Sequence, residues 1–452
     1  MPVRSERVAV IGLGYVGLPL AVGFACAGHD VTGFDIDHWR IDELKGGHDR
    51  TGEIGTAQLS KAKLTLTDER APLRDRGIYV LTVPTPVDGD NNPDLSSVLA
   101  AAATVGKALR ASRAQRPLPI VVLESTVYPG VTEDVLGPAI EKESGKKRGK
   151  DFLLGYSPER INPGDREHGL ARIVKVVAAE TDAATARLVV LYGSIAKAGV
   201  HVAPSIRTAE AAKVIENAQR DVNIAFINEV TMIFERLGLA TEDVLAAART
   251  KWNFLDFRPG LVGGHCIGVD PYYLAHCAAA AGHTAEIILA GRRINDDMGA
   301  WMADRVADAY ENAPGPARKR VGAKNRKRSS TDAAPRTLVL GLAFKENIPD
   351  IRNTRVELLM SRLATRGHRV EVHDALADAG DARAQYGIEL LQSLDAVSQP
   401  YDCVVAAVGH NEYRALSDAD FARLVAPGGL VADLKGIWRG RALPKNRRRW
   451  EL

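Results

Sequence analysis

A strand, a glycine-rich turn and a helix open the chain, and this order restricts the fold more than any other feature. Residues 7–11 read R-V-A-V-I, and G-L-G-Y-V-G follows at 12–17 before an apolar segment that ends in glycine. In this context Gly12 permits a tight turn, Gly14 lets a pyrophosphate approach the backbone, and Gly17 allows close packing of the helix. The pattern predicts a dinucleotide-binding α/β domain, with the phosphate charge at the helix N-terminus.

A carboxylate follows the second apolar run, D-V-T-G-F-D-I-D. Asp35 stands at the distance from Gly17 at which an acid accepts the ribose hydroxyls, and an acid there favours NAD over NADP. Arg40 lies just beyond and either covers the adenosine or is a solvated arginine at a helix start. The turn itself adds Tyr15 and Val16 to the expected cofactor contacts.

Two later apolar runs, 78–86 and 119–127, end in Thr or Ser beside Pro. Ligands bind at the carboxyl ends of parallel strands, so Thr85 and Thr126 are expected to contact the nicotinamide half of the cofactor. The alternative is that each residue only caps a helix.

Length and composition indicate a globular protein of two or three domains. The chain has 452 residues, of which 46% are hydrophobic and 25% charged, and its formal net charge of +3 does not imply a polyanionic partner. The N-terminus lacks the order of a secretory signal, and no apolar run approaches the roughly 20 residues of a membrane span. We therefore expect a cytoplasmic protein without a membrane partner. Four cysteines without close pairing favour reduced thiols over disulfides or zinc.

The segment from Ser205 contains neither Pro nor Gly until Gly238, which predicts one long helix. Lys213, Asn217 and Arg220 recur at helical spacing on one face. They are either a solvated polar face or a set of donors that stabilise an oxyanion and contact a substrate.

Cys266 lies in the glycine-dense stretch G-L-V-G-G-H-C-I-G-V-D, residues 260–270, where a loop turns into a helix near Pro271. A thiol at such a junction has its pKa lowered by N–H groups and cations, and the glycines, Gly264 among them, let ligands approach. The alternative is a small thiol that only packs, as we expect for the other cysteines.

These motifs, with others along the chain, resemble the UDP-glucose/GDP-mannose dehydrogenase family over nearly the whole length. Seven blocks match in order: G-L-G-Y-V-G-L-P-L, V-P-T-P, E-S-T-V-Y-P-G, Y-S-P-E-R-I, A-E-A-A-K-V-I-E-N, G-G-H-C-I-G-V-D-P-Y-Y-L and G-L-A-F-K-E-N-I-P-D-I-R-N-T. S-P-E-R-I-N-P-G and N-F-L-D-F-R-P-G-L-V-G-G-H-C resemble the members that oxidise UDP-N-acetylhexosamines, especially the UDP-N-acetylglucosamine and UDP-N-acetylgalactosamine 6-dehydrogenases of bacterial polysaccharide synthesis.

The resemblance implies a set of catalytic residues. Cys266 matches the nucleophile, Lys213 and Asn217 match the lysine and asparagine of the central helix, and Asp270 supports the water or base step. The residues that position the hydrolytic water are implied to be Thr126 and Glu159.

The resemblance also implies substrate and cofactor contacts, and for the basic residues Arg258, Lys345, Arg352 and Lys435 a surface salt bridge is the alternative. Pro163 stands where UDP-glucose dehydrogenases carry a second glutamate, which favours the N-acetyl subclass. Arg352 is expected to reach the NAD site, and Arg258 matches an arginine that binds substrate across a subunit boundary in some members. The remaining implied substrate contacts are Arg160, Ile161, Phe344, Lys345 and Lys435.

Together these features predict two Rossmann-like domains joined by a long central helix. The expected parts are an NAD-binding domain at 1–203, a central helical and dimerisation domain at 204–300, and a UDP-sugar-binding domain at 301–452. The expected assembly is a homodimer through the central helix. We expect the basic segment 314–336 to be a solvated linker and not a nucleic-acid site.

Chemistry explains why such a site has a thiol. Oxidation of a C6 alcohol to a carboxylate removes four electrons and NAD accepts two, so a Cys266 thiohemiacetal and thioester would hold the sugar between two oxidations without a metal. UDP-N-acetylmannosamine and UDP-glucose are alternative substrates. The motifs also allow a two-electron dehydrogenase of similar fold, which needs no thiol, or a nucleotide-sugar sensor that has lost the chemistry.

Overall fold

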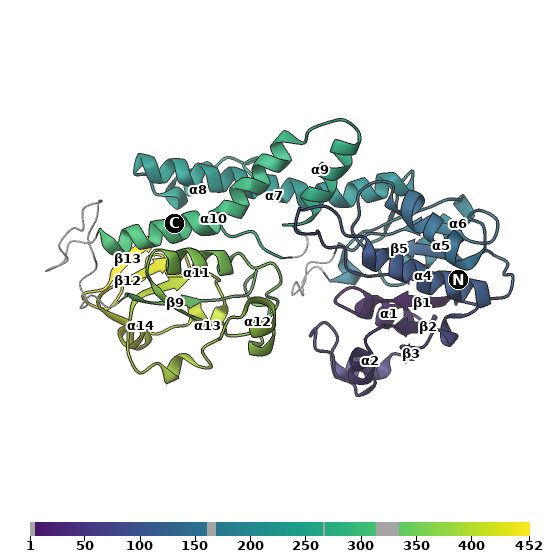
Figure 1. Ribbon diagram of the computed structural model, residues 1–452, viewed down its shortest axis with the longest axis horizontal. Coiled ribbons are helices and arrows are strands. Elements are labelled where there is room, and N and C mark those ends of the chain that lie inside the picture. The colour runs from purple at the N-terminus through teal and green to yellow at the C-terminus, as the bar shows by residue number, and fades with distance from the viewer. Residues whose placement is uncertain (1–4, 161–168, 265–266, 313–333) are drawn as a thin grey trace. The chain divides into compact units, whose positions relative to one another are not determined.

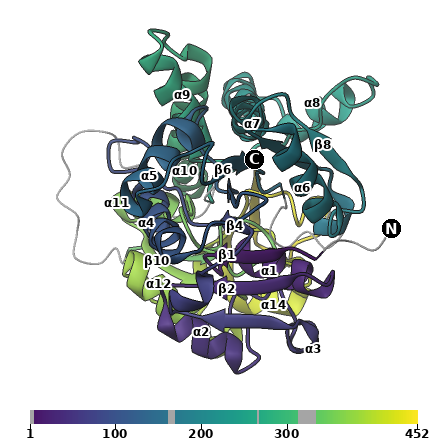
Figure 2. The ribbon, with the colours of Figure 1, turned by 90° about the vertical axis from the view of Figure 1, so that its right-hand side faces the viewer.

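The computed structural model describes residues 5–160, 169–264, 267–312 and 334–452 (Figures 1 and 2). The chain forms two compact units, the first from residues 1–218 and 269–285 and the second from 219–268 and 286–452. The division of the chain into three parts at 203 and 300 stays a prediction.

The first unit is built on an eight-stranded sheet, in the order β3-β2-β1-β4-β5-β6-β7-β8. Neighbouring strands run parallel, except that β7 is antiparallel to β6. The strands are β1 Arg7–Ile11, β2 Asp30–Phe34, β3 Leu64–Thr67, β4 Ile78–Leu81, β5 Ile120–Leu123, β6 Leu153–Tyr156, β7 Lys175–Ala179 and β8 Val200–Val202.

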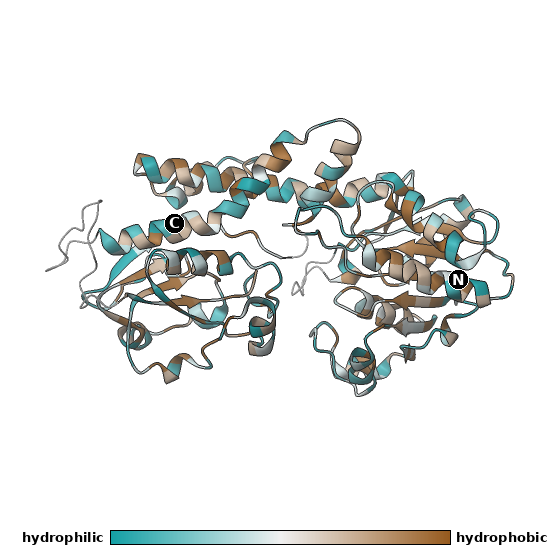
Figure 3. Ribbon diagram, in the orientation of Figure 1, coloured by the Kyte–Doolittle hydropathy of each residue, from teal (hydrophilic) through white to brown (hydrophobic). Residues whose placement is uncertain are grey.

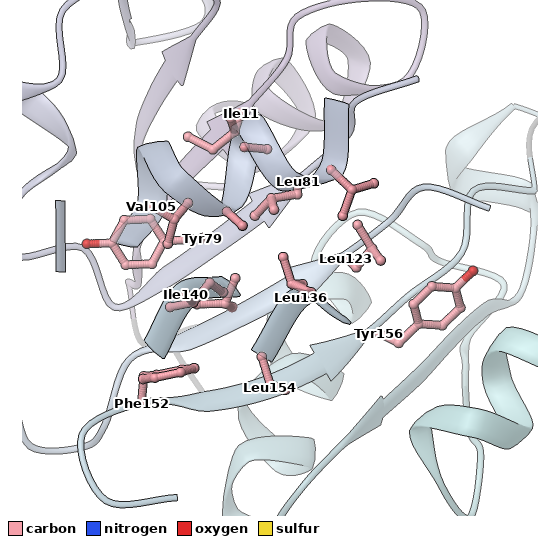
Figure 4. Packing of buried hydrophobic residues seen from close by; sticks show 14 of the residues in the cluster. Ile11, Tyr79, Leu81, Val105, Leu123, Leu136, Ile140, Phe152, Leu154 and Tyr156 are labelled. Carbon is pink, nitrogen blue, oxygen red and sulfur yellow. The ribbon is translucent and has the colours of Figure 1, made fainter. Parts of the chain in front are cut away.

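Helices cover both faces of this sheet because its strands are apolar on both sides. Ala9 and Ile11 of β1 pack in a cluster with α4 and α5, and Val8 and Val10 pack in a second cluster with α1 and α6. Figure 4 shows the first cluster, including Tyr79. The helices are α1 Gly17–Cys26, α2 His38–Lys45, α3 Thr56–Lys61, α4 Ser96–Ala111, α5 Gly137–Ser144, α6 Asp182–Gly193 and α9 Asp270–Ala280.

The second unit contains a five-stranded parallel sheet in the order β10-β9-β11-β12-β13. Its strands are β9 Arg336–Leu340, β10 Arg369–His373, β11 Tyr401–Ala406, β12 Val425–Asp433 and β13 Arg448–Glu451. Val339 packs with α10 and α11 on one face, and Leu338 packs with α13 and α14 on the other. The helices are α8 Thr241–Ala248, α10 Glu286–Glu311, α11 Val356–Thr365, α12 Ala379–Tyr386, α13 Asn411–Arg414 and α14 Asp418–Leu424.

Both units use the same turn after their first strand. Gly12 follows β1 with φ +94° and donates its N–H to Phe34, while Gly341 follows β9 with φ +96° and donates to His373, each at 2.8 Å. A carboxylate then accepts the next N–H: Asp35 in the first unit at 2.7 Å and Asp374 in the second at 2.6 Å. The prediction of two Rossmann-like domains is confirmed, although the second has no G-x-G-x-x-G motif.

The predicted long helix is confirmed as α7, Ile206–Leu237, which begins in the first unit and ends in the second. It has 32 residues and ends before Gly238, whose φ of +69° suits a glycine. Lys213 and Asn217 on this helix are buried, which excludes a solvated face for these two residues, while Ile215 is 53% exposed. Hydropathy colouring shows apolar strands and helices of mixed character (Figure 3). No helix among the described residues is long and apolar enough to cross a membrane.

The cysteines outside the glycine-dense stretch differ from one another. Cys403 is buried, and burial raises the pKa of its thiol to about 12, which makes it an inert core residue. Cys277 is half-buried and Cys26 is exposed, so the expectation that all three pack in a core is wrong for Cys26. Cys26 is the last residue of α1 and is not part of the cluster that this helix forms with the sheet.

The Asp374 carboxylate is expected to be necessary for the stability of the second unit. It accepts four backbone N–H groups, from Leu342, Ala343, Leu376 and Ala377, and the Nε2 of His410. Although burial favours a higher pKa, the hydrogen bonds from His410 and the backbone hold the pKa of Asp374 well below its usual range.

We predict that Asp374→Ala lowers the free energy of unfolding by about 3–5 kcal/mol, because several buried N–H groups lose their acceptor. Urea denaturation measures the change. The control is Asp395→Ala, whose side chain is 91% exposed and whose loss is expected to cost about 0.5 kcal/mol or less. Equal, small effects of both variants would show that the turn does not need its carboxylate.

Candidate active site

The three glycines of the first turn differ in whether the protein itself leaves room for a side chain. A Cβ on Gly17 would lie 1.8 Å from the carbonyl oxygen of Gly12, and a Cβ on Gly12 would lie 3.0 Å from that of Thr82. The packing of the protein therefore requires both. A Cβ on Gly14 would meet nothing within 4 Å, and this glycine is exposed. The open space over Gly14, at the start of α1, fits the pyrophosphate of a dinucleotide.

Side chains fix the shape of this turn. The Thr82 hydroxyl donates to the carbonyl of Gly12 at 2.7 Å, a role that sequence reasoning missed. Asp35 accepts the N–H of Leu13, so part of its hydrogen-bonding capacity serves the turn. Tyr15 and Val16 are half-buried beside it.

Arg40 is not the solvated arginine of one interpretation of the sequence, because it is only 3% exposed. Its Nε donates to the carbonyl of Leu13 at 3.0 Å, and its guanidinium contacts the Asp49 carboxylate at 2.7 Å. The Arg40 side chain is therefore buried and not solvated. Its hydrogen bond to the carbonyl of Leu13 supports the cofactor turn. A contact with the adenosine stays a prediction.

The loops after β4 and β5 meet at the carboxyl edge of the sheet. The Thr85 hydroxyl donates to the carbonyl of Thr126 at 2.8 Å, and the Ser125 hydroxyl donates to the carbonyl of Val83 at 2.5 Å. Thr85 and Thr126 are thus neighbours, as their positions after parallel strands predict. Neither side chain caps a helix through its own hydroxyl among the described hydrogen bonds.

A buried lysine, amide and carboxylate form the centre of the site in the first unit. Asn217 donates its Nδ2 to Oδ2 of Asp270 at 2.5 Å, and Lys213 lies one turn earlier on α7. Their exposed fractions are 8% for Lys213, 5% for Asn217 and 3% for Asp270. Burial raises the pKa of Asp270 to about 6, against the opposing effects of Lys213 and Asn217. Lys213 and Asn217 therefore belong to a buried polar cluster and not to a solvated face.

Arg220, the third member of the predicted stripe, is exposed. The structure therefore does not bury it with Lys213 and Asn217. Its contact with a substrate stays a prediction.

Glu159 lies after β6 and is held from two sides. One carboxylate oxygen accepts the N–H of Arg160 at 2.6 Å, and the other lies 3.5 Å from Nζ of Lys175. The Lys175 ammonium also contacts the Glu124 carboxylate at 2.6 Å. Sequence reasoning missed Lys175 and Glu124, although charges at the ends of apolar strands were a signal.

Burial raises the pKa of Glu124 to about 7. For Lys175, burial favours a lower pKa, but attraction to Glu124 and Glu159 outweighs it and raises the pKa. The ammonium is therefore charged. Arg160 lies beside this group and pairs with Glu216 of α7 at 2.9 Å.

The second unit shapes the loop that precedes Cys266 around an aromatic ring. A Cβ on Gly264, whose φ is +85°, would lie 2.7 Å from the Phe344 ring. A pocket beside this contact is lined by Gly263, Phe344, Lys345, Arg355 and Lys435, among others. The structure thus brings the predicted substrate residues Gly264, Phe344, Lys345 and Lys435 together.

The lysines of this pocket set its charge. Burial favours a higher pKa for Glu346, but Lys435 and Lys345 outweigh it and lower the pKa. A cationic pocket lined by an aromatic ring suits a nucleoside diphosphate.

A buried amide holds the same loop from α7. Asn228 donates its Nδ2 to the carbonyl of Gly260 at 3.0 Å and accepts the N–H of Gly260 at 2.8 Å. Asn228 also donates to Asn295 of α10, which donates to the Asp221 carboxylate, each at 2.8 Å. These fully buried side chains restrict the loop and were missed by sequence reasoning.

Two predicted arginines have acidic partners in the second unit. Arg352 pairs with Asp350 at 2.5 Å, and Arg258 pairs with Glu242 at 2.7 Å and Asp256 at 3.0 Å. Their contacts with NAD and substrate stay predictions. Cys266 and Ile161 lie outside the described residues, as does most of the basic segment 314–336.

Models of one family match three consecutive parts of the chain. The NAD binding domain matches residues 6–196, the central domain residues 207–297, and the UDP binding domain residues 338–440. The chain belongs to the UDP-glucose/GDP-mannose dehydrogenase family, which confirms the resemblance of the seven blocks. The cofactor of its first domain is NAD.

Individual relatives match along nearly the whole chain. Protein CapL of Staphylococcus aureus is 45% identical, over 99% of this chain and 100% of the relative. UDP-N-acetyl-D-glucosamine 6-dehydrogenase of Pseudomonas aeruginosa is 46% identical, over 96% of this chain and 97% of the relative. The structure of UDP-D-ManNAc dehydrogenase from Pyrococcus horikoshii superposes with a TM-score of 0.82 at 28% identity, over 98% of each chain.

Alanine at Gly14 and alanine at Gly17 are predicted to impair different properties, the first cofactor binding and the second stability. Gly14→Ala meets open space in the protein but intrudes on the pyrophosphate, so NAD affinity falls while the melting temperature changes little. Gly17→Ala collides with backbone, so the melting temperature itself falls. Differential scanning fluorimetry and calorimetric NAD titration measure the two effects. A large loss of stability in Gly14→Ala would show that the open space belongs to the fold and not to the ligand.

Proposed function

We propose that the protein oxidises the C6 hydroxyl of a UDP-N-acetylhexosamine, UDP-GlcNAc or UDP-GalNAc, to the uronic acid with NAD. The observation that carries this proposal is the buried Lys213, Asn217 and Asp270 cluster in the NAD-binding unit. Asp270 follows Cys266 by four positions, so the cluster lies next in sequence to the only cysteine in the glycine-dense stretch.

The residues of the cluster have complementary roles. Lys213 exchanges a proton with the substrate oxygen, and Asn217 helps to stabilise the oxyanion that develops there. Bound NAD supplies the oxidant, accepting two electrons in each of two successive oxidations. Between them, Cys266 adds to the aldehyde carbon and holds the sugar as a thiohemiacetal, which becomes a thioester. Water then releases the acid, with Thr126 and Glu159 positioning it.

Several observations support UDP-GlcNAc or UDP-GalNAc over the alternative substrates. The 46% identical relative is a UDP-N-acetyl-D-glucosamine 6-dehydrogenase, whereas the UDP-D-ManNAc dehydrogenase of known structure is 28% identical. Pro163 replaces the second glutamate that UDP-glucose dehydrogenases carry at this position. UDP-ManNAc and UDP-glucose are the alternative substrates. The resemblance to enzymes of bacterial polysaccharide synthesis supports a role in supplying uronic acids for a cell-surface polysaccharide. We propose that the protein performs this role in the cytoplasm.

The proposed homodimer is supported by apolar side chains on α7. Phe226 is 59% exposed, Ile233 48% and Leu237 65%, in the half of α7 that belongs to the second unit. A second copy of the chain would remove them from water.

The proposal predicts about two NADH per sugar with UDP-GlcNAc or UDP-GalNAc, measured at 340 nm beside UDP-ManNAc and UDP-glucose. Cys266→Ala is expected to lower the rate of uronic acid formation roughly 10³-fold or more, because the covalent adduct is lost. Cys26→Ala, which removes an exposed thiol, is the matched control.

Three contrary results would each have a distinct meaning. An unchanged stoichiometry and rate in Cys266→Ala would exclude the covalent mechanism. One NADH per sugar from the wild type would indicate a two-electron dehydrogenase. Absence of NADH with every sugar would favour a nucleotide-sugar sensor.

The pH profile of kcat/KM is predicted to have an acidic limb that arises from protonation of Asp270. The ionised carboxylate accepts the stronger hydrogen bond from the Asn217 amide and balances the charge of Lys213, and burial raises its pKa to about 6. Below about pH 6 the acid binds a proton, so kcat/KM is expected to fall roughly tenfold per pH unit as the pH decreases. The residual activity of Asp270→Asn should lack this limb. Retention of the limb in Asp270→Asn would assign it to another group.

A further inference from the structure

Lys175 is a lysine without solvent contact whose three N–H groups all meet oxygen atoms. Its side chain is 2% exposed, and Nζ lies 2.6 Å from the Glu124 carboxylate, 2.8 Å from the carbonyl oxygen of Pro158 and 3.5 Å from the Glu159 carboxylate. The Tyr192 ring lies on another side, with its centroid 5.4 Å from Nζ. An ammonium group has three donors, so this set of acceptors satisfies it.

The strand order explains how Lys175 reaches this position. β7 is antiparallel to β6, with Tyr156 opposite Ala178, so the first residue of β7 lies at the carboxyl end of β6. A parallel strand would begin at the opposite edge of the sheet. The one antiparallel pairing among the described strands of this sheet therefore brings a cation to the edge where ligands bind.

The contacts of Lys175 join two of the sequence blocks. Glu124 directly follows β5 and opens E-S-T-V, while Pro158 and Glu159 belong to S-P-E-R after β6. The backbone N–H of Glu159 also approaches the carbonyl of Glu124 at 3.4 Å. The ammonium thus fixes Glu159 relative to the segment that carries Thr126.

The two carboxylates beside Lys175 differ in exposure. The Glu124 side chain is 0% exposed and lies nearer to the ammonium, at 2.6 Å, whereas the Glu159 side chain is 14% exposed and lies at 3.5 Å. A purely structural ion pair needs only Glu124. The second, partly exposed carboxylate is the one that can also contact water.

We propose that Lys175, anchored by Glu124, is a positioning residue that orients the Glu159 carboxylate for hydrolysis of the thioester. This inference rests on the proposed function. In the step, the water oxygen bonds to the acyl carbon and the carbon–sulfur bond breaks, with its electron pair going to sulfur. One proton of the water ends on the sulfur and the other leaves to solvent from the product acid. Lys175 does not touch the substrate and acts through Glu159.

Two single substitutions separate this role from the stability of the ion pair. Lys175→Met and Glu124→Gln both remove the buried ion pair, but only Lys175→Met takes the cation away from Glu159. Each variant is mixed with NAD and the UDP-sugar that the wild type oxidises. NADH is followed in the first turnover and at steady state, and acid-quenched protein is weighed by intact mass spectrometry.

In Lys175→Met we expect a first-turnover burst of NADH close to that of the wild type, because both oxidations precede hydrolysis. The steady-state rate is expected to fall about 10- to 100-fold, with an acyl adduct on the protein, since a small misplacement of a reacting group costs this much. Glu124→Gln is expected to show no adduct and a smaller loss of rate, because Lys175 still contacts Glu159.

If Lys175→Met does not fold, the double variant with Glu124→Gln, which leaves no buried charge unpaired, takes its place in the same comparison with Glu124→Gln alone. Equal losses of rate in the compared variants, with no adduct, would overturn the inference and leave the pair a structural one. A wild type that makes no NADH from any UDP-sugar would instead overturn the proposed function.

Discussion

A carboxylate at the end of the second strand holds the turn after the first strand in each unit. Asp35 accepts the N–H of Leu13, and Asp374 accepts the N–H of Leu342. The preceding glycine, at positive φ, turns the backbone so that these N–H groups point away from the strand and need an acceptor. The cofactor turn and the loop that carries Phe344 both depend on this interaction, because each begins at the residue that the carboxylate holds.

Burial of charge at the carboxyl edge of the first sheet produces the rest of the site. Asp270 and Lys175 are both removed from water, and each is tolerated because hydrogen bonds and an opposite charge replace hydration. The same burial that raises the pKa of Asp270 brings it into the range where proton transfer is useful.

Much of the fold could be predicted from local pattern. The glycine turn, the strands on either side of it and the extent of α7 follow from spacing and from the positions of glycine and proline. Burial was harder to predict. The sequence left Arg40 open between a cover for the adenosine and a solvated helix-start residue, and its buried contacts with Leu13 and Asp49 exclude the solvated alternative. Glu124 and Lys175 are far apart in the chain, and only the antiparallel β7 brings them into contact.

The sequence by itself determined the fold class, the cofactor turn, the long helix and the family, because these depend on short-range periodicity and on motifs that are contiguous in the chain. Only the tertiary structure decided which polar residues are buried together. Lys213 and Asn217 form a buried polar cluster because α9 places Asp270 against them, and Ile215 of the same helix stays exposed. Helical spacing shows which side chains share a face, but the dielectric environment of that face depends on what packs against it.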